Sequence, residues 1–151
     1  MKIAFLYAGQ GSQRVGMGRD LYDASPAFRA AFDAGHLDFD LHALCFEGAQ
    51  ETLNQTQYTQ PCMVAFACGV TAALFDAGLR PDYVAGLSLG EYSALEASGV
   101  LTSKSAIELA AYRGAAMAKA SEGIQSAMTA VLGLDREALM RCCDEAGALG
   151  V

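Results

Sequence analysis

Three short runs of apolar residues, each bounded by glycine or polar residues, predict β-strands. Residues 3–8 form the first run, which stops at the glycine-rich segment 9–13 and predicts a buried strand. Residues 82–87 form the second and lead directly to Ser88. Residues 127–134 form the third, with roughly alternating character. The long segments between these runs suggest parallel strands joined by helices, and therefore an α/β fold.

The longer segments carry helical patterns. The clearest begins at Thr59-Gln60-Pro61 and runs to about Ala77, with Pro61 expected in the first turn and Gly78 as a left-handed cap. Its apolar residues surround the axis, which predicts a central, buried helix. Other helices are expected over residues 19–35 with a boundary at Ser25-Pro26, over 41–46, over 89–97, from an N-cap at Thr102 to about 120, and from 135 or 136 to 146. In the first of these, Phe28, Ala31 and Phe32 fall on one apolar face.

Composition narrows the class of protein. The 151 residues are 53% hydrophobic and 18% charged, as expected for a folded domain, and the net charge of −7 disfavours a nucleic-acid partner. Five cysteines without a C-x-x-C pair predict no disulfide framework or metal site, with Cys62 and Cys68 as core residues. The longest apolar stretch, 61–74, contains Gly69 and Thr71 and is too short for a membrane span. We expect a cytoplasmic domain that binds neither membrane nor nucleic acid.

The turn Gly86-Leu87-Ser88-Leu89-Gly90 carries the main chemical signal. A G-x-S-x-G sequence between a strand and a helix is typical of a nucleophile elbow, in which the serine hydroxyl is exposed on a tight turn. The glycines avoid clashes with the neighbouring strand and helix. The N–H of Leu89 would point to the place where an oxyanion forms, and the helix N-terminus would add partial positive charge there. Ser88 is therefore the candidate nucleophile.

Four separate parts of the chain follow one another in the sequence: Gly9-Gln10-Gly11-Ser12-Gln13 with Gly16-Met17-Gly18, the Gln60-Pro61 pair, the Ser88 turn continued through Glu91-Tyr92-Ser93-Ala94-Leu95, and the helix of Arg113. Together they closely resemble the malonyl-CoA:acyl carrier protein transacylase family over essentially the whole chain. The resemblance implies an α/β-hydrolase-like core and an enzyme of fatty acid biosynthesis. In that reaction a serine takes the malonyl group from coenzyme A and passes it to the phosphopantetheine thiol of acyl carrier protein.

The resemblance also assigns roles to single residues. Gln10 matches the side chain that completes the oxyanion hole with the Leu89 N–H, and Arg113 matches the arginine that binds the free carboxylate of malonate. A planar guanidinium suits bidentate carboxylate recognition, and Arg113 lies among alanines where a purely structural charge would be unusual. Gln60 is a weaker candidate for substrate binding. No metal or cofactor is expected, because the acyl group arrives already activated as a thioester.

The chain departs from the family at two points. Leu87 stands where the family often has histidine, and the histidine that serves as general base in the family has no counterpart here. The two histidines, His36 and His42, both precede Ser88 and match neither position. We therefore expect a fragment, with residues 1–125 forming the amino-terminal part of the acyltransferase core and 126–151 opening a truncated ferredoxin-like subdomain; a separate polypeptide supplying the base is the other explanation. Alone, the chain is predicted to be nearly inactive.

Three other functions remain open at this point. A serine esterase or peptidase of the α/β-hydrolase type would share the turn but release acyl groups to water. A non-catalytic module would bind carrier protein or coenzyme A without chemistry. An acyltransferase with another extender unit, such as methylmalonyl, would keep the carboxylate-binding arginine. The sequence does not give the oligomeric state.

Overall fold

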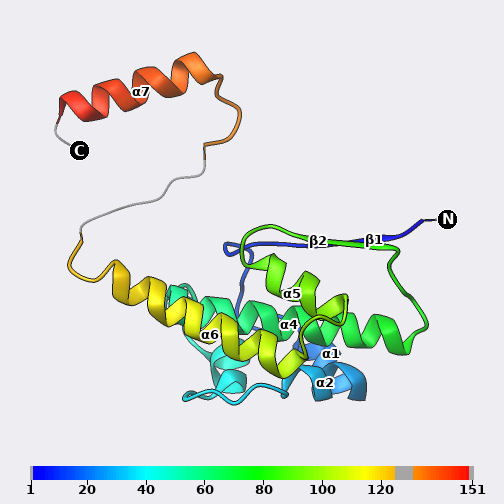
Figure 1. The fold of residues 1–151 in the computed structure, drawn as a ribbon. Coiled ribbons are helices and arrows are strands. Elements are labelled where there is room, and N and C mark those ends of the chain that lie inside the picture. The colour runs from blue at the N-terminus through cyan, green and yellow to red at the C-terminus, as the bar shows by residue number, and fades with distance from the viewer. Residues whose placement is uncertain (1, 125–130, 150–151) are drawn as a thin grey trace.

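The computed structural model describes residues 2–124 and 131–149. Its sheet consists of two parallel strands, β1 (Ala4–Tyr7) and β2 (Tyr83–Gly86), paired in the register Ala4↔Tyr83 to Tyr7↔Gly86. Figure 1 shows the two strands side by side on one side of a group of helices. The parallel α/β architecture predicted from the sequence is confirmed.

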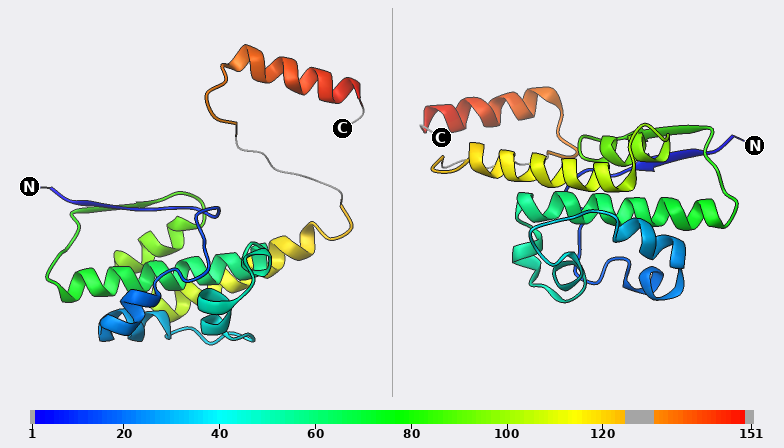
Figure 2. Two further views of the ribbon diagram at one scale, coloured as in Figure 1. Left: turned by 180° about the vertical axis from the view of Figure 1, so that it is seen from behind. Right: turned by 60° about the horizontal axis from the view of Figure 1, so that its bottom comes forward.

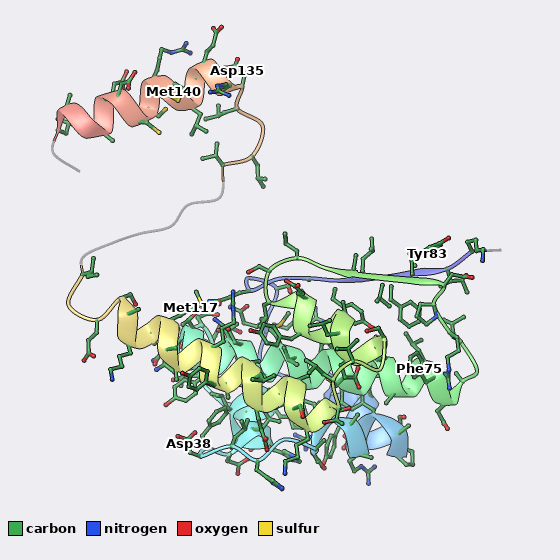
Figure 3. All side chains as sticks on the ribbon, viewed as in Figure 1. Asp38, Phe75, Tyr83, Met117, Asp135 and Met140 are labelled. Atoms are coloured by element: carbon green, nitrogen blue, oxygen red, sulfur yellow. The ribbon has the colours of Figure 1, made fainter. Side chains whose placement is uncertain are left out.

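One face of this sheet is covered by helices and the other is open. Phe5 and Val84, which are partners in the register, point toward the helices and are half-buried. Leu6 and Tyr83 alternate with them and are 79% and 64% exposed. Tyr83 is labelled on the strand in Figure 3. The prediction of a buried first strand is therefore wrong for one of its faces, because no described residue packs on that side.

Helix α4 (Thr56–Asp76) runs through the centre of the molecule. Every residue from Thr59 to Ala65 is buried, as expected for a helix whose apolar residues surround its axis. By length and composition α4 alone among the described residues could cross a membrane, yet 56% of its apolar window is buried inside the fold. We interpret it as the core helix of the domain. Cys62 and Cys68 on this helix are fully buried, as predicted.

The predicted start of α4 is wrong, while its end is confirmed. The helix begins at Thr56, so Pro61 is its sixth residue and lies beyond the first turn. The missing N–H of a proline at this depth costs one hydrogen bond within the helix. Packing of α4 on its neighbours outweighs this local cost. At the other end Gly78, at φ 80°, closes the helix with hydrogen bonds from Gly78 N to Phe75 O and from Leu79 N to Leu74 O.

The segment between the strands adds short helices below α4 (Figure 1). Helices α1 (Arg19–Ala24) and α2 (Pro26–Phe32) meet at Ser25, whose hydroxyl accepts from Phe28 N, so the predicted boundary is confirmed. Phe28, Ala31 and Phe32 form the buried face of α2, as predicted. The helix expected over 41–46 is confirmed over 41–47, but most of it is wound as a π-helix, η1 (Ala43–Glu47). The sequence pattern also missed α3 (Gln50–Leu53), which has only four residues.

The carboxyl-terminal half contributes α5 (Gly90–Ala97), α6 (Ser103–Ala120) and α7 (Arg136–Ala148). Their bounds agree with the predictions, and the Thr102 hydroxyl caps α6 by accepting from Ser105 N. Figure 2 shows α6 beside α4, between the sheet and the short helices. No residue of α7 is buried. Of the strand predicted over 127–134, residues 127–130 lie outside the described residues, and residues 131–134 are not in a strand.

Candidate functional site at Ser88

Ser88 occupies the sharp turn between β2 and α5. Its φ is 53°, the one positive φ at a described residue other than glycine, and this left-handed conformation typically costs about 1–3 kcal/mol. The strand before it and the helix after it leave its side chain exposed at the carboxyl end of the strand. Ser88 thus combines a strained backbone with an exposed side chain.

The glycines on either side permit the close approach of backbone segments. A Cβ on Gly86 would lie 2.1 Å from the backbone C and O of Gly90. A Cβ on Gly90 would lie 2.2 Å from the carbonyl oxygen of Tyr7, at the end of β1. Any side chain at either position would force the backbone apart. The pattern is therefore required by packing between β1, β2 and the start of α5.

Arg113 reaches Ser88 from α6. Its Nη2 donates to Ser88 Oγ at 3.2 Å, and its Nη1 donates to Gln60 Oε1 at 2.7 Å. Gln60 is fully buried on α4 and donates through Nε2 to the sulfur of Met117 at 3.3 Å. No described carboxylate forms an ion pair with Arg113. The guanidinium charge is thus held in place by a neutral amide and stays available to an anion.

Gln10 lies in the loop that follows β1. A Cβ on the preceding residue, Gly9, would be 3.0 Å from the carbonyl oxygen of Leu87, so this loop lies against the residue before Ser88. The Thr56 hydroxyl donates to Gln10 Oε1 at 2.8 Å. Among the described residues, Gln10 Nε2 forms no hydrogen bond, whereas Oε1 accepts from Thr56. The amide nitrogen therefore keeps its two donors.

The backbone at the start of α5 supplies another open donor. Leu89 is the N-cap residue of α5, is 1% exposed and has helical backbone angles. The hydrogen bonds of the following turn begin with Gly90 N to Leu87 O and Glu91 N to Ser88 O. Within the described part of the chain, the N–H of Leu89 has no acceptor. Unpaired N–H groups at a helix N-terminus carry partial positive charge and bind anions.

The two histidines make their contacts elsewhere. His42 Nε2 lies 2.7 Å from Asp33 Oδ1, and its ring packs edge-on against Tyr22 and Phe32. The backbone N of His36 donates to Glu108. Neither contacts Ser88, as the sequence predicts. The described residues also contain no group of three or more histidine, cysteine or acidic side chains that could hold a metal ion.

Sequence reasoning missed two members of this cluster. Thr56, at the start of α4, contacts Gln10, and Met117 contacts the buried amide of Gln60. Figure 3 labels Met117 on α6. A helix predicted to begin at Thr59 leaves Thr56 in a loop, which concealed its part in the site. The spacing of four residues between Thr56 and Gln60, and between Arg113 and Met117, places each pair on one helix face and could have revealed both.

The parallel α/β fold thus places an exposed serine on a strained strand-to-helix turn next to an arginine that forms no ion pair with a described carboxylate. Comparison with known proteins gives the family. The acyl transferase domain family matches residues 4–149, and the chain belongs to it.

Individual relatives agree with this assignment. The malonyl CoA-acyl carrier protein transacylase of Bacillus subtilis is 43% identical over 146 residues, covering 95% of this chain and 46% of its own length. The crystal structure of the corresponding protein of Streptococcus pneumoniae superimposes with a TM-score of 0.82 at 45% identity, covering 99% of this chain and 50% of that one. A malonyl-transacylase solved in complex with a type II polyketide acyl-carrier protein gives a TM-score of 0.81 at 38% identity, covering 96% and 48%. The chain therefore spans about half the length of these relatives.

Proposed function

We propose that this chain carries the acylation half of a malonyl-CoA:acyl carrier protein transacylase site, with Ser88 as the nucleophile of an elbow. The contact of Arg113 with Ser88 supports this most directly, because it places an unpaired guanidinium beside the atom that would be acylated. Names of the similar proteins supply the substrates, malonyl-CoA and acyl carrier protein. Malonyl units attached to a carrier protein feed fatty acid or polyketide synthesis. We also propose that the fold of this domain is α/β-hydrolase-like.

In the proposed first step, Ser88 Oγ attacks the thioester carbonyl of malonyl-CoA and a base accepts the hydroxyl proton. The tetrahedral oxyanion would accept hydrogen bonds from the Leu89 N–H and the Gln10 amide nitrogen. Loss of one such donor costs about 2.7–4 kcal/mol of barrier in other enzymes. Collapse of this intermediate releases coenzyme A as a thiol and leaves malonyl-Ser88. In the second step, the phosphopantetheine thiol of the carrier attacks the ester and restores the serine hydroxyl.

Arg113 would select the malonyl group. Its Nη1 is held by Gln60, so Nη2 can exchange its contact with Ser88 Oγ for the free carboxylate of the substrate. Full burial of Gln60 argues against the direct substrate contact considered from the sequence, and favours orientation of the guanidinium instead. A methylmalonyl group carries the same carboxylate, so this clamp does not separate the two extender units.

The general base would come from outside these 151 residues, because neither histidine ring forms a hydrogen bond with Ser88: the His42 ring pairs with Asp33, and His36 is joined to Glu108 through its backbone N–H. The 151 residues alone are then expected to transfer malonyl groups very slowly. Robust transfer by them alone that is abolished by His36→Ala or His42→Ala would contradict this assignment.

We also propose that residues 126–151 open a ferredoxin-like subdomain after an acyltransferase core in 1–125. The protein would work in the cytoplasm, where its five free cysteines remain reduced.

Hydrolysis is the principal competing function, and the products distinguish it. The protein expressed with its whole native coding sequence should be incubated with malonyl-CoA and carrier protein bearing phosphopantetheine. Malonyl-carrier product that is lost in Ser88→Ala supports transfer. Free malonate as the main product would indicate an esterase, and binding of carrier without any malonyl-serine would indicate a non-catalytic module.

A further inference from the structure

We propose that Thr56 is a positioning residue, whose hydroxyl fixes the Gln10 side-chain amide so that the nitrogen remains free to donate to an oxyanion at Ser88. The expected effect of Thr56 on the rate of Ser88 acylation rests on the proposed function. The structural content of the inference, the orientation of one amide group by one hydroxyl, can be tested separately. Thr56 lies outside both the glycine-rich loop and the Ser88 turn.

The orientation follows from where Thr56 lies. It is the first residue of α4, and its Oγ1 donates to Gln10 Oε1 at 2.8 Å. A helix N-terminus carries partial positive charge, which attracts a carbonyl oxygen and repels the N–H₂ group of an amide. Both the hydroxyl donor and the helix end therefore favour the same arrangement, with the oxygen toward α4 and the nitrogen away from it.

The position of Thr56 links this contact to the rest of the site. On one side, Gln10 follows Gly9, which lies against the carbonyl of Leu87. On the other, a Cβ on Gly114 would be 2.8 Å from the carbonyl oxygen of Thr56, so α6 packs on the first turn of α4 directly beside Arg113. Thr56 thus lies between the loop of one proposed donor and the helix of the proposed carboxylate ligand.

A similar orienting contact is made one helical turn further along α4. Gln60 is four residues after Thr56, on the same face, and its Oε1 accepts from Arg113 Nη1 at 2.7 Å. In both cases a side chain of α4 holds one polar atom of a flexible side chain and thereby orients the rest of it: the Gln10 amide nitrogen points away from α4, and Arg113 Nη2 reaches Ser88 Oγ. The exposed Gln10 side chain would otherwise sample several rotamers and both amide orientations.

The kinetic test measures the rate at which malonyl-CoA acylates Ser88, in the protein expressed with its whole native coding sequence. Thr56→Val removes the hydroxyl at nearly constant volume and should slow acylation about 10- to 100-fold, whereas loss of the donor itself in Gln10→Ala should slow it about 10²- to 10³-fold. Thr56→Ser should restore the rate. Thr52→Val on α3 is the matched control and should leave it unchanged. In the Gln10→Ala background, Thr56→Val should have no further effect.

Equal slowing by Thr56→Val with and without Gln10 would overturn the proposal, because a general structural defect acts in both backgrounds.

A second measurement does not depend on activity. In the ¹⁵N-labelled protein expressed with its whole native coding sequence, the side-chain amide resonances of Gln10, identified by their loss in Gln10→Ala, should keep distinct shifts in Thr56→Ser and move to free-glutamine values in Thr56→Val. Unchanged shifts in Thr56→Val would overturn the inference even if Ser88 is acylated. Normal shifts with no malonyl-Ser88 in the unsubstituted protein would instead remove the proposed function.

Discussion

Arg113 Nη2 donates a hydrogen bond to Ser88 Oγ across 3.2 Å, although the two residues are 25 positions apart in the sequence. One comes from the turn after β2 and the other from the middle of α6. Packing of α6 on α4 brings them together, since Gly114 allows the first turn of α4 to approach within backbone contact. This single contact joins the proposed nucleophile to the proposed determinant of substrate choice.

Replacing Arg113 should therefore change which acyl group is accepted. Arg113→Ala should slow acylation of Ser88 by malonyl-CoA about 10- to 100-fold, because a hydrogen bond to a charged group contributes about 1.5–3 kcal/mol. Acylation by acetyl-CoA should be unaffected or faster, because an acetyl group lacks the free carboxylate that Arg113 would bind. The ratio of the two acylation rates is the measurement. Equal slowing of both would mean that Arg113 supports Ser88 and does not select the substrate.

A matched variant separates charge from shape. Arg113→Lys keeps the positive charge but loses the planar fork and the contact geometry with Gln60. We expect it to recover only part of the malonyl preference. Full recovery would show that a point charge is sufficient and that orientation by Gln60 has no role.

The left-handed backbone of Ser88 should affect the free energy of unfolding of variants at this position. At φ 53°, glycine avoids the Cβ clash that any other residue experiences, a difference of about 1–2 kcal/mol. Ser88→Gly should therefore unfold at a higher denaturant concentration than Ser88→Ala, the reverse of the order found within a helix. Chemical denaturation of the two variants provides the comparison. A Ser88→Ala protein at least as stable as Ser88→Gly would contradict a strained turn.

The flanking glycines should tolerate no side chain. Gly90→Ala places a methyl group 2.2 Å from the carbonyl oxygen of Tyr7, so the β1–α5 contact must open. We expect a loss of about 1–3 kcal/mol or more in the free energy of unfolding. Gly147→Ala is the control, because a Cβ there meets nothing within 4 Å. A Gly90→Ala protein as stable as Gly147→Ala would mean that the turn is looser than described.

A buried carboxyl predicts how stability changes with pH. Burial raises the pKa of Glu96, whose Oε1 accepts from the Ser103 hydroxyl while Oε2 is buried without a partner. The folded protein therefore holds this proton more tightly than the unfolded chain. Stability should fall as pH rises from the ordinary glutamate pKa through the raised value, since a buried carboxylate replaces a neutral group.

Glu96→Gln removes this titration and keeps an acceptor for Ser103. Its melting temperature relative to the unsubstituted protein should rise between acidic and neutral pH, and the gain should vanish at pH values below the ordinary glutamate pKa. Thermal unfolding at a series of pH values tests this. A difference that does not depend on pH would show that folding leaves the pKa of Glu96 unchanged.

Much of this architecture could be predicted from local patterns. The strand ending at Ser88, the caps at Ser25, Thr102 and Gly78, and the all-round apolar character of α4 were each visible in a few neighbouring residues. The start of α4 was not, because a proline five residues inside a helix is unfavourable locally and is tolerated only through packing. The π-helical winding of Ala43–Glu47 likewise has no signature in the residue pattern.

The residues of the candidate site also differ in how far the sequence predicts them. Ser88 and the glycines around it follow from one short motif, whereas the roles of Gln10 and Arg113 came from resemblance to a family. The partners that orient them, Thr56 and Gln60, depend on how α4 packs against a loop and against α6. Such contacts between segments far apart in the sequence are set by the tertiary fold, which local patterns do not contain.

The most direct test of the central claim is to trap the acyl-enzyme. The protein expressed with its whole native coding sequence should be mixed with malonyl-CoA, quenched in acid, digested and analysed by mass spectrometry. We predict one malonyl group as an ester on the peptide that contains Ser88, absent in Ser88→Ala and strongly reduced in Arg113→Ala. A protein that passes malonyl groups to carrier protein while Ser88 remains unmodified, or that does so equally well as Ser88→Ala, would contradict the account.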